Sequence, residues 1–384
     1  MEVYLDNSAT TQCTKSVVEV MSKIMLEEYG NPSSLHCKGM NAEKQIKEAK
    51  RIIASNLKVK EKEILFTSGG TESDNLALIG AAHAANRRGK HIITTEVEHP
   101  AVLEALEFLK TEGFEISYLP VDRFGVVSLQ TLQENLRPDT ILVSVMHTNN
   151  EIGSIQPVAQ MGIWLKEKRP EILFHVDAVQ GYGKATIHPY KQGIDLMSVS
   201  GHKIHGPKGV GFLYCNERVR LLPIMFGGGQ QKGIRPGTEN VPGIAGLGKA
   251  VEEIYKTLEE DLKRMYQLRE KFIDELCKID GITVNGYPDE RNAPHIISLS
   301  VAEIRSEVLL HALESEGIYI SSGSACASNH TTTSSTLKAI GMQKELLDKT
   351  VRFSLSNKTT EEEMRYTIAK LYDMIPMLRK FTRR

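Results

Sequence analysis

The sequence predicts an α/β protein with a large domain, built on a mostly parallel sheet, and a smaller α+β domain. Strand-like apolar runs alternate with helical patterns through residue 215, which is typical of a parallel sheet covered by helices on both faces. After residue 280 the order becomes β–β–α–β. The 384 residues exceed one ordinary core. We therefore expect a large domain at 16–260 and a small domain made of 1–15 and 261–384.

The bulk composition is that of an ordinary globular chain. Hydrophobic residues make up 41% and charged residues 25%, and the formal net charge is −1, so neither nucleic acid nor an anionic membrane is indicated as a partner. No apolar run is long enough to span a bilayer, and the first residues do not resemble a signal peptide. The five cysteines are scattered without a CxxC pair, which argues against disulfides or a zinc site and fits the reducing cytoplasm.

The first third of the chain predicts an extended arm over residues 1–15, a helix near 16–29, a loop and a charged helix at Asn41–Leu57. The strand Glu63–Thr67 then runs into SGGTESDN, where glycines precede a helix. Gly70 and Thr71 would suit a phosphate, because backbone N–H groups at a helix start attract anions, and Thr, Ser and Asp suit an N-cap. Taken in isolation, an ordinary capped helix is the favoured interpretation.

Two further strands end in polar residues. One ends at Glu98, His99 and Pro100, and the proline suits the first position of a new helix. His99 could then lie over a flat cofactor ring or transfer a proton, although a histidine at a strand end is more often only a satisfied polar residue. The other strand leads to Asn149, Asn150 and Glu151, whose amides could reach a cofactor oxygen or simply form a turn.

The stretch 175–211 carries the strongest chemical signal. Asp177 ends one apolar run, and Ser200, His202 and Lys203 end the next. Because functional groups gather at the carboxyl ends of parallel strands, we expect these side chains to lie together. The lysine could form a Schiff base with an aldehyde cofactor whose pyridinium nitrogen the aspartate holds. A buried Asp–Lys ion pair explains the two residues equally well.

The remaining chain adds three features. VGFLYC (210–215) is expected to be an antiparallel strand, and the glycine-rich segment Met225–Thr238 places Arg235 and Thr238 where they could reach an anion, before a helical pattern over 241–279. In the small domain, the polar loop at about 322–336 contains Cys326, which we expect to be exposed and reactive. Arg352 lies on the last strand, and its guanidinium suits a carboxylate.

Ten motifs together resemble one family. YLDNSATT, GNPSSLH, TSGGTESDN, EHPAV, NNEIGSIQP, HVDAVQ, SGHKIHGPKGVG, GGGQ…RPGTEN, SSGSACAS and VRFSLS occur in the order found in the NifS/IscS cysteine desulfurases. That family is similar to pyridoxal-phosphate enzymes of the aspartate-aminotransferase fold, fold type I, class V. The resemblance extends from Val3 to about Lys370, and it implies a seven-stranded type of sheet in the large domain and pyridoxal 5'-phosphate as the cofactor.

The resemblance implies a role for each matching residue. Lys203 would form the Schiff base, Asp177 would pair with the pyridine nitrogen, and His99 would stack on the ring and transfer protons. The phosphate would be held by Gly70, Thr71, Ser200, His202 and, from the partner subunit of a homodimer, Thr238. Gln180 and Asn150 would lie near the phenolic oxygen. Arg352, with Asn150 close by, would bind the substrate carboxylate, and no residue would bind a metal.

The implied reaction converts L-cysteine to L-alanine and leaves a persulfide on the nucleophile Cys326. The long polar segment from Cys326 to Leu337 is similar to the first group of the family, which donates sulfur to protein acceptors for iron–sulfur cluster assembly or tRNA thiolation. Gln231 and Pro236 depart from the family pattern, which often has Glu and Ser there. The alternatives are a selenocysteine lyase or another class V aminotransferase-like activity, and a non-catalytic sulfur-transfer or scaffold-binding partner with the same fold.

Overall fold

Alternating apolar side chains divide the core of the large domain between the two faces of one sheet. The computed structural model describes residues 1–322 and 334–382 of the chain. Phe66, Val143 and Val176 pack on one face against α1, α2, α6 and α8. Leu65 and Leu142 point to the other face, which is covered by α3 and α4. The helices are α1 (Lys15–Glu27), α2 (Cys37–Leu57), α3 (Gly70–Ala85), α4 (Pro100–Thr111), α5 (Leu129–Asn135), α6 (Val158–Lys168), α7 (Pro189–Gln192) and α8 (Val241–Lys256).

The sheet has the strand order β2-β8-β7-β6-β5-β3-β4. β8 runs antiparallel to β2 and β7, and the other neighbours are parallel. The predicted fold class, with a mostly parallel sheet and an antiparallel strand at 210–215, is therefore confirmed. The strands are β2 (Ile64–Thr67), β3 (His91–Thr95), β4 (Glu115–Leu119), β5 (Thr140–Ser144), β6 (Leu173–Asp177), β7 (Leu196–Ser200) and β8 (Gly211–Cys215).

Three helix boundaries differ from the sequence prediction. The helix expected from residue 41 begins at Cys37, because the ring of His36 caps it by accepting from the Gly39 N–H at 3.3 Å. α3 begins at Gly70 with Gly69 at the cap, so no Thr, Ser or Asp side chain caps it. The single helical stretch expected over 241–279 is broken at Thr257, whose φ and ψ of −124° and 13° are not helical.

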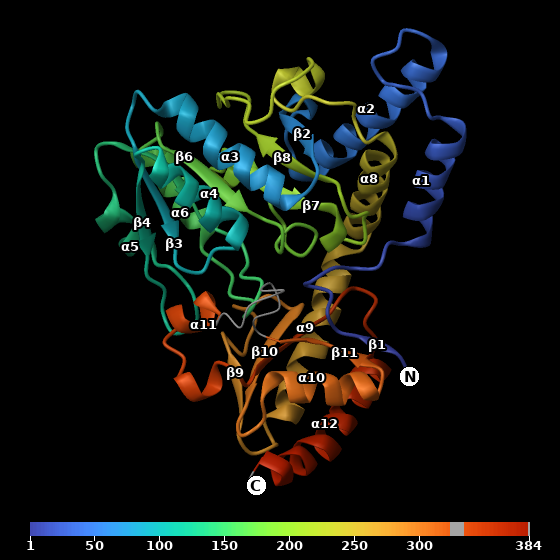
Figure 1. Cartoon of the computed structure of the whole chain (residues 1–384), viewed down its shortest axis with the longest axis vertical. Coiled ribbons are helices and arrows are strands. Elements are labelled where there is room, and N and C mark those ends of the chain that lie inside the picture. Colours follow the sequence, from blue (N-terminus) through green and yellow to red (C-terminus); the bar gives the residue numbers. More distant parts are fainter. Residues whose placement is uncertain (323–333, 383–384) are drawn as a thin grey trace.

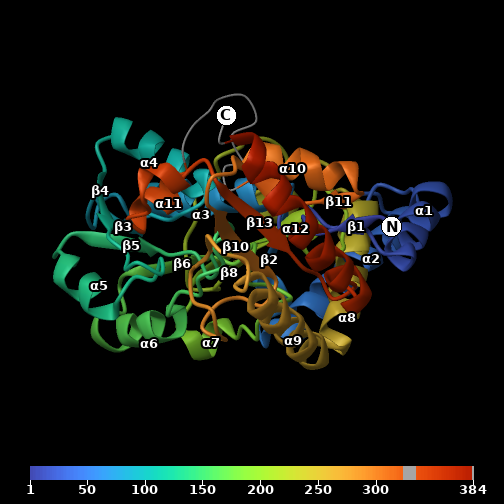
Figure 2. The ribbon, with the colours of Figure 1, turned by 90° about the horizontal axis from the view of Figure 1, so that it is seen from below.

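The small domain, which lies below the large sheet, combines two sheets with several helices (Figure 1). An antiparallel sheet has the order β12-β13-β10-β9, while β1 of the N-terminal arm pairs in parallel with β11. α12 lies beside α9 over this domain (Figure 2). The elements are β1 (Val3–Tyr4), α9 (Leu258–Leu276), β9 (Ile282–Asn285), β10 (Ile296–Val301), α10 (Ser306–Ser315), β11 (Ile318–Tyr319), β12 (Ser321–Ser322), α11 (Ser335–Ala339), β13 (Thr350–Ser354) and α12 (Glu361–Thr382).

One apolar cluster holds the small domain together and includes the arm. Val3 and Leu5 are fully buried with Phe272 of α9 and Phe353 of β13, whose rings meet edge to face at 5.2 Å between centroids. The boundary expected near residue 260 falls in the first turn of α9. Over the described ranges, no helix is both long and apolar enough to cross a bilayer.

Candidate active site

The carboxyl ends of β6 and β7 carry the polar side chains singled out from the sequence. Asp177 is the last residue of β6 and Ser200 is the last residue of β7. A short 3-10 turn, Gly201–Lys203, follows β7 directly and carries His202 and Lys203. Because β6 and β7 are parallel neighbours, these side chains all reach the same edge of the sheet, where the small domain faces them.

A pocket of about 340 Å³ lies at this edge. It brings together ten of the residues named from the sequence: Gly70, Thr71, His99, Asn150, Asp177, Gln180, Ser200, His202, Lys203 and Arg352. Sequence reasoning did not find six other lining residues: Ser8, Ala9, Asp74, Met146, Thr148 and Val179. The pocket therefore gathers groups from the arm, the large sheet and β13.

Asp177 is a buried carboxylate whose charge is only partly compensated. One of its oxygens, Oδ1, accepts a hydrogen bond from the Val179 N–H at 2.9 Å. Burial raises the pKa of Asp177, and the nearby His99 and Lys203 oppose that rise. A cationic ring nitrogen placed beside it would stabilise the ionised form. Asp74 is also buried in the pocket wall, and burial together with Asp177 raises the pKa of Asp74 well above its usual range.

His99 is fixed by the helix that it starts. Its Nδ1 accepts a hydrogen bond from the Ala101 N–H at 3.1 Å, and Pro100 takes the first helical position of α4. The neutral ring therefore carries its proton on Nε2. Burial lowers the pKa of His99, while Asp177 opposes and Lys203 adds to that shift. A neutral, half-buried imidazole at the pocket wall can stack on a ring and exchange a proton.

The start of α3 forms a cradle for an anion. Gly69 has a φ of 153°, which few residues other than glycine adopt, and the helix begins at the next residue. A Cβ on Gly70 would come within 2.7 Å of Val179 Cγ2, so only glycine leaves room there. His202 closes the cradle, and burial lowers the pKa of its ring to about 4, which keeps it neutral. Unpaired N–H groups at a helix start bind phosphate well.

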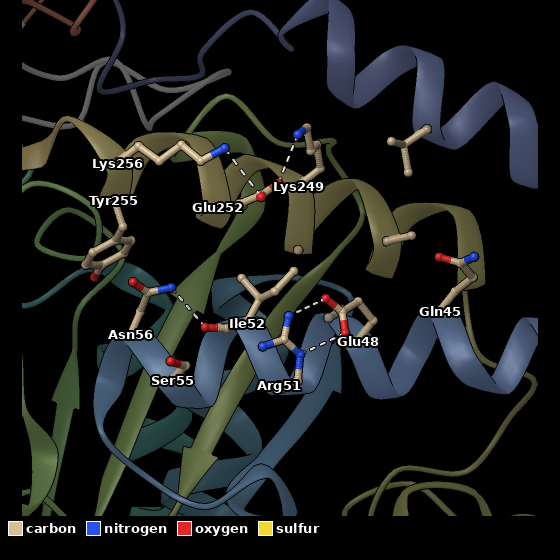
Figure 3. A pocket seen from close by; sticks show the side chains of 14 residues that line it. Gln45, Glu48, Arg51, Ile52, Ser55, Asn56, Lys249, Glu252, Tyr255 and Lys256 are labelled. Atoms are coloured by element: carbon tan, nitrogen blue, oxygen red, sulfur yellow. Dashed lines mark hydrogen bonds and ion pairs between the residues drawn. The ribbon is translucent and has the colours of Figure 1, made fainter.

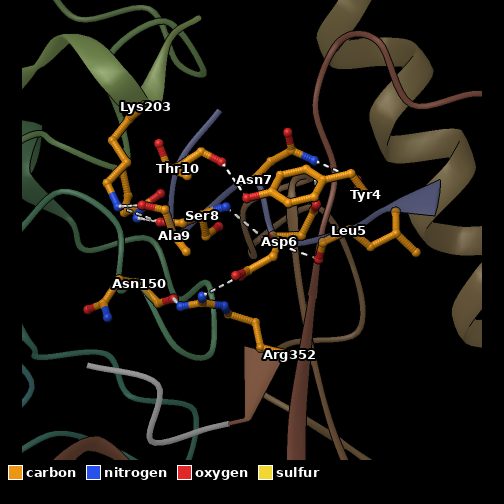
Figure 4. Close-up of polar contacts among 12 residues, drawn as sticks. Tyr4, Leu5, Asp6, Asn7, Ser8, Ala9, Thr10, Asn150, Lys203 and Arg352 are labelled. Atoms are coloured by element: carbon orange, nitrogen blue, oxygen red, sulfur yellow. Dashed lines mark hydrogen bonds and ion pairs between the residues drawn. The ribbon is translucent and has the colours of Figure 1, made fainter. Parts of the chain in front are cut away.

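Arg352 is oriented by two contacts on opposite sides of the domain boundary. Its Nη1 donates to the Asn150 carbonyl oxygen at 2.7 Å, and its Nη2 pairs with Asp6 Oδ1 at 3.0 Å (Figure 4). The guanidinium is only 4% exposed. Its Nε is buried and has no hydrogen-bond partner among the described residues. Arg352 therefore keeps donor capacity for a carboxylate in the pocket.

The arm holds Lys203 through main-chain atoms. Lys203 Nζ donates to the Ser8 carbonyl at 2.5 Å and to the Ala9 carbonyl at 2.8 Å (Figure 4). Gln180 Nε2 donates to the same Ser8 carbonyl at 2.9 Å. These contacts could not be found from sequence, because every residue has a backbone carbonyl and no side-chain pattern marks the ones that are used.

The residues of the pocket fit pyridoxal phosphate. Gln180 Oε1 and Arg352 Nε are buried without partners in the described residues, and such atoms usually meet a ligand or water. A lysine, a buried carboxylate and a glycine cradle surround the same space. This donor set suits an aldehyde, a ring nitrogen and a phosphate respectively.

Two predicted residues, Thr238 and Arg235, lie outside the pocket, and a third falls outside the described residues. Thr238 is exposed and does not line the pocket. Arg235, the other residue expected near an anion, pairs instead with Glu72, with its Nε 2.8 Å from Glu72 Oε1. Cys326 lies outside the described residues. The residues on either side of that segment lie close to the pocket, because Ser321 pairs with Arg352 across β12 and β13 and Ser334 donates to Glu151 at 2.5 Å.

A second and larger hollow lies between α2 and α8 (Figure 3). Its volume is about 440 Å³. The charged side chains of its wall bind one another: Arg51 pairs with Glu48, and Lys249 and Lys256 both pair with Glu252. None of the predicted site residues that the structure describes lines it. The volume of a hollow therefore does not identify the active site, because the predicted site residues line the smaller pocket at the strand ends.

The fold and the pocket define an α/β enzyme that binds pyridoxal phosphate at the carboxyl ends of a parallel sheet. The family model "Aminotransferase class-V" matches residues 3–366. A protein of Dictyoglomus turgidum named cysteine desulfurase IscS is 45% identical over 98% of this chain and 95% of its own length. A NifS-like protein of known structure has 40% identity and a TM-score of 0.93, covering 98% of this chain and 100% of that chain.

A further solved structure, described as SspA in complex with cysteine, is 33% identical with a TM-score of 0.79 over 93% of this chain and all of its own. These likenesses cover nearly the whole chain. The chain belongs to the class-V aminotransferase family and, within it, to the IscS cysteine desulfurases. Pyridoxal phosphate is the cofactor of this family.

Proposed function

We propose that this enzyme removes sulfur from L-cysteine, releasing L-alanine and leaving a persulfide on Cys326. The observation that carries the proposal is the meeting of Lys203, Asp177 and Arg352 in one pocket. The first two suit the cofactor and the third suits the carboxylate of an amino acid. In the reaction the C–S bond of cysteine breaks, an S–S bond to Cys326 forms, and the thiol proton of Cys326 balances the hydrogen gained by alanine.

Each residue has a distinct part in this proposal. Bound pyridoxal phosphate supplies an aldehyde for amine condensation and a ring that withdraws electrons from the α-carbon. Lys203 provides the amine and, when it is not bonded, a base that takes the α-proton at Nζ. Asp177 holds a proton on the ring nitrogen, and the Nε2–H of His99 lies on the pocket wall as a proton donor. Gly70, Thr71, Ser200 and His202 bind the phosphate.

Arg352 orients the substrate, and the segment that follows β12 in the sequence contains the thiol of Cys326. Asp6 and the Asn150 carbonyl hold the guanidinium, so its remaining donors face the pocket. Arg352 pairs with Ser321 at the start of that segment, and Glu151 binds Ser334 at its end. A segment attached at both ends beside the pocket supports Cys326 as the nucleophile that takes the sulfur.

The test uses L-cysteine labelled with radioactive sulfur. We expect wild-type protein to retain the label as a persulfide that a reducing agent releases. Cys326→Ala should still bind cofactor and cysteine but hold no labelled persulfide and release no sulfide. Lys203→Ala should lose the cofactor absorbance of the wild type. Full sulfide release by Cys326→Ala would disprove the persulfide step, and a strong preference for selenocysteine retained without Cys326 would favour a selenocysteine lyase.

We also propose a homodimer in which Thr238 binds the phosphate of the partner subunit's cofactor. Large apolar side chains are exposed on α1, on the loop after it and on the loop that ends at Thr238: Leu35 is 97% exposed and Phe226 is 84% exposed. Such apolar area is typical of a surface covered by another chain. Thr238 itself is exposed on the same loop as Phe226.

Mixing two inactive variants tests the shared site. Lys203→Ala lacks the amine and Thr238→Val lacks the hydroxyl, but a mixed dimer contains one site with both. Because that site takes Lys203 from one subunit and Thr238 from the other, unfolding and refolding the mixture should restore up to about a quarter of wild-type activity. No gain over the separate variants would place Thr238 in its own subunit's site or outside any site.

The sulfur acceptor is proposed to be a protein of iron–sulfur cluster assembly or of tRNA thiolation. We expect the enzyme to work in the cytoplasm, since the four cysteines within the described residues are all free. Trapping the labelled persulfide and identifying which protein removes it would distinguish the two acceptor classes.

A further inference from the structure

Lys184 is a buried lysine that the proposed reaction does not use. It follows β6 by seven residues and is about nine-tenths buried. Its Nζ has no hydrogen-bond partner in the part of the chain that the structure describes. A buried ammonium without a partner is costly, so its presence beside a catalytic pocket needs an explanation.

A small internal cavity connects Lys184 with Lys203. Both side chains line it, together with His205 and residues of α9. Its interior of about 10 Å³ has room for roughly one water molecule. Asp261 is the acid in this wall, but its carboxylate already accepts from Thr257 at 2.7 Å and from Asn357 at 3.2 Å. Lys184 and Lys203 therefore line the same cavity, and the carboxylate of Asp261 in its wall is already hydrogen-bonded to Thr257 and Asn357.

Burial and the nearby positive charge of Lys203 both disfavour a proton on Lys184. Burial lowers the pKa of Lys184 to about 7, and the positive charge of Lys203 contributes to that shift. The electrostatic effect is mutual, because a proton on one amine disfavours a proton on the other. Lys184 likewise helps to lower the pKa of three neighbouring rings, those of His202, His205 and His295. Asp177, by contrast, favours the positive charge of Lys203.

Several contacts of Lys203 favour its charged form, so an opposing effect is needed to keep the amine neutral. The Ser8 and Ala9 carbonyls accept from its Nζ, and Asp177 is an anion. Only a neutral amine can attack an aldehyde or accept an α-proton. We propose that Lys184 is a positioning residue that disfavours the positive charge on Lys203 and so keeps the Lys203 amine available for bond formation. The inference rests on the proposed role of Lys203.

The test measures the protonation of Lys203 directly, without turnover. Full-length protein stripped of cofactor is treated with formaldehyde and cyanoborohydride, which methylate neutral amines, and peptide mass spectrometry reports the labelling of Lys203 against pH. Lys184→Met removes the amine whose proton competes with that of Lys203, so the midpoint of Lys203 labelling should rise. Lys184→Arg keeps a charge that does not titrate, so that midpoint should fall below the wild-type value.

The holoenzyme provides a second readout, because the pH midpoint of its cofactor absorbance should shift in the same directions. Lys191→Met, which alters an exposed lysine on α7, is the control and should leave both midpoints unchanged. An unchanged midpoint in both Lys184 variants, or shifts in the same direction, would overturn the inference. If Lys184→Met does not fold, the downward shift in Lys184→Arg decides. Failure of the proposed function is seen separately, as sulfide release by Lys203→Ala.

Discussion

Replacing Glu98 by glutamine should stabilise the protein and remove a pH dependence of its stability. Glu98 is fully buried beside His99, and its Oε1 accepts from Thr95 at 2.7 Å and from the Met146 N–H at 3.0 Å. Burial raises the pKa of Glu98 to about 8, with Asp177 adding to the rise. At neutral pH the folded protein therefore holds a proton on Glu98 that the unfolded chain releases.

The size of the effect follows from the two pKa values. The ordinary value is 4.5 and the folded value is about 8, so between them the folded state binds one more proton than the unfolded state. Stability then falls as pH rises through this window, by about 1.4 kcal/mol per pH unit. Glutamine keeps the Oε1 acceptor and does not titrate. We expect Glu98→Gln to raise the free energy of unfolding by about 2 kcal/mol at pH 6, about 3 at pH 7 and about 4 at pH 8.

Urea denaturation of both proteins at pH 6, 7 and 8 measures this difference. Glu96→Gln serves as the control, because Glu96 is exposed at the end of the same strand and its replacement should change stability little at any pH. A difference between Glu98→Gln and wild type that stays constant across the three pH values would refute the reasoning, since it would mean that the buried carboxyl does not take up a proton on folding.

Three other changes test the substrate site, the small domain and the dimer. Arg352→Lys should raise KM for cysteine at least about tenfold in steady-state assays while the cofactor absorbance stays intact, because an ammonium cannot form a two-pronged contact with a carboxylate; an unchanged KM would contradict this role. Phe353→Ala should lower the free energy of unfolding by about 3–5 kcal/mol through loss of its buried packing against Phe272, visible as a lower Tm. Leu35→Asp should shift the sedimentation coefficient from dimer to monomer, and a dimer retained in this variant would place the interface elsewhere.

The fold class was predictable because its signals are local. Apolar runs such as ILFT and HIITT are short and continuous, which is typical of strands buried on both faces, and they correspond to β2 and β3. β3 ends at Thr95, however, which is three residues before the strand end expected at Glu98. The side chains at the strand ends followed from the same pattern. His99 and Pro100 begin α4 as expected, and Thr360 accepts from the Glu363 N–H at 3.2 Å at the start of α12.

The rest of the site depends on contacts between distant segments. Asp6 pairs with Arg352, and the arm supplies carbonyls to Lys203, yet no local pattern marks either contact. Asp74 was interpreted only as a residue that suits a helix start, but α3 begins earlier, at Gly70, and Asp74 is buried in the pocket wall. The way in which distant segments meet in the fold, and not the local sequence, decides where these groups lie.

The N-terminal arm also constrains the order in which the protein folds. Asn7 donates to the Ser354 carbonyl and Asp6 pairs with Arg352, across separations of 347 and 346 residues in the sequence. During synthesis from the N-terminus the arm emerges long before β13, so Asp6 and Asn7 lack these partners while the large sheet forms. Closing so long a loop carries an entropic cost. The arm can meet Lys203 beside the large sheet earlier, but Arg352 gains its contact with Asp6, and the site its complete form, only after β13 has been made.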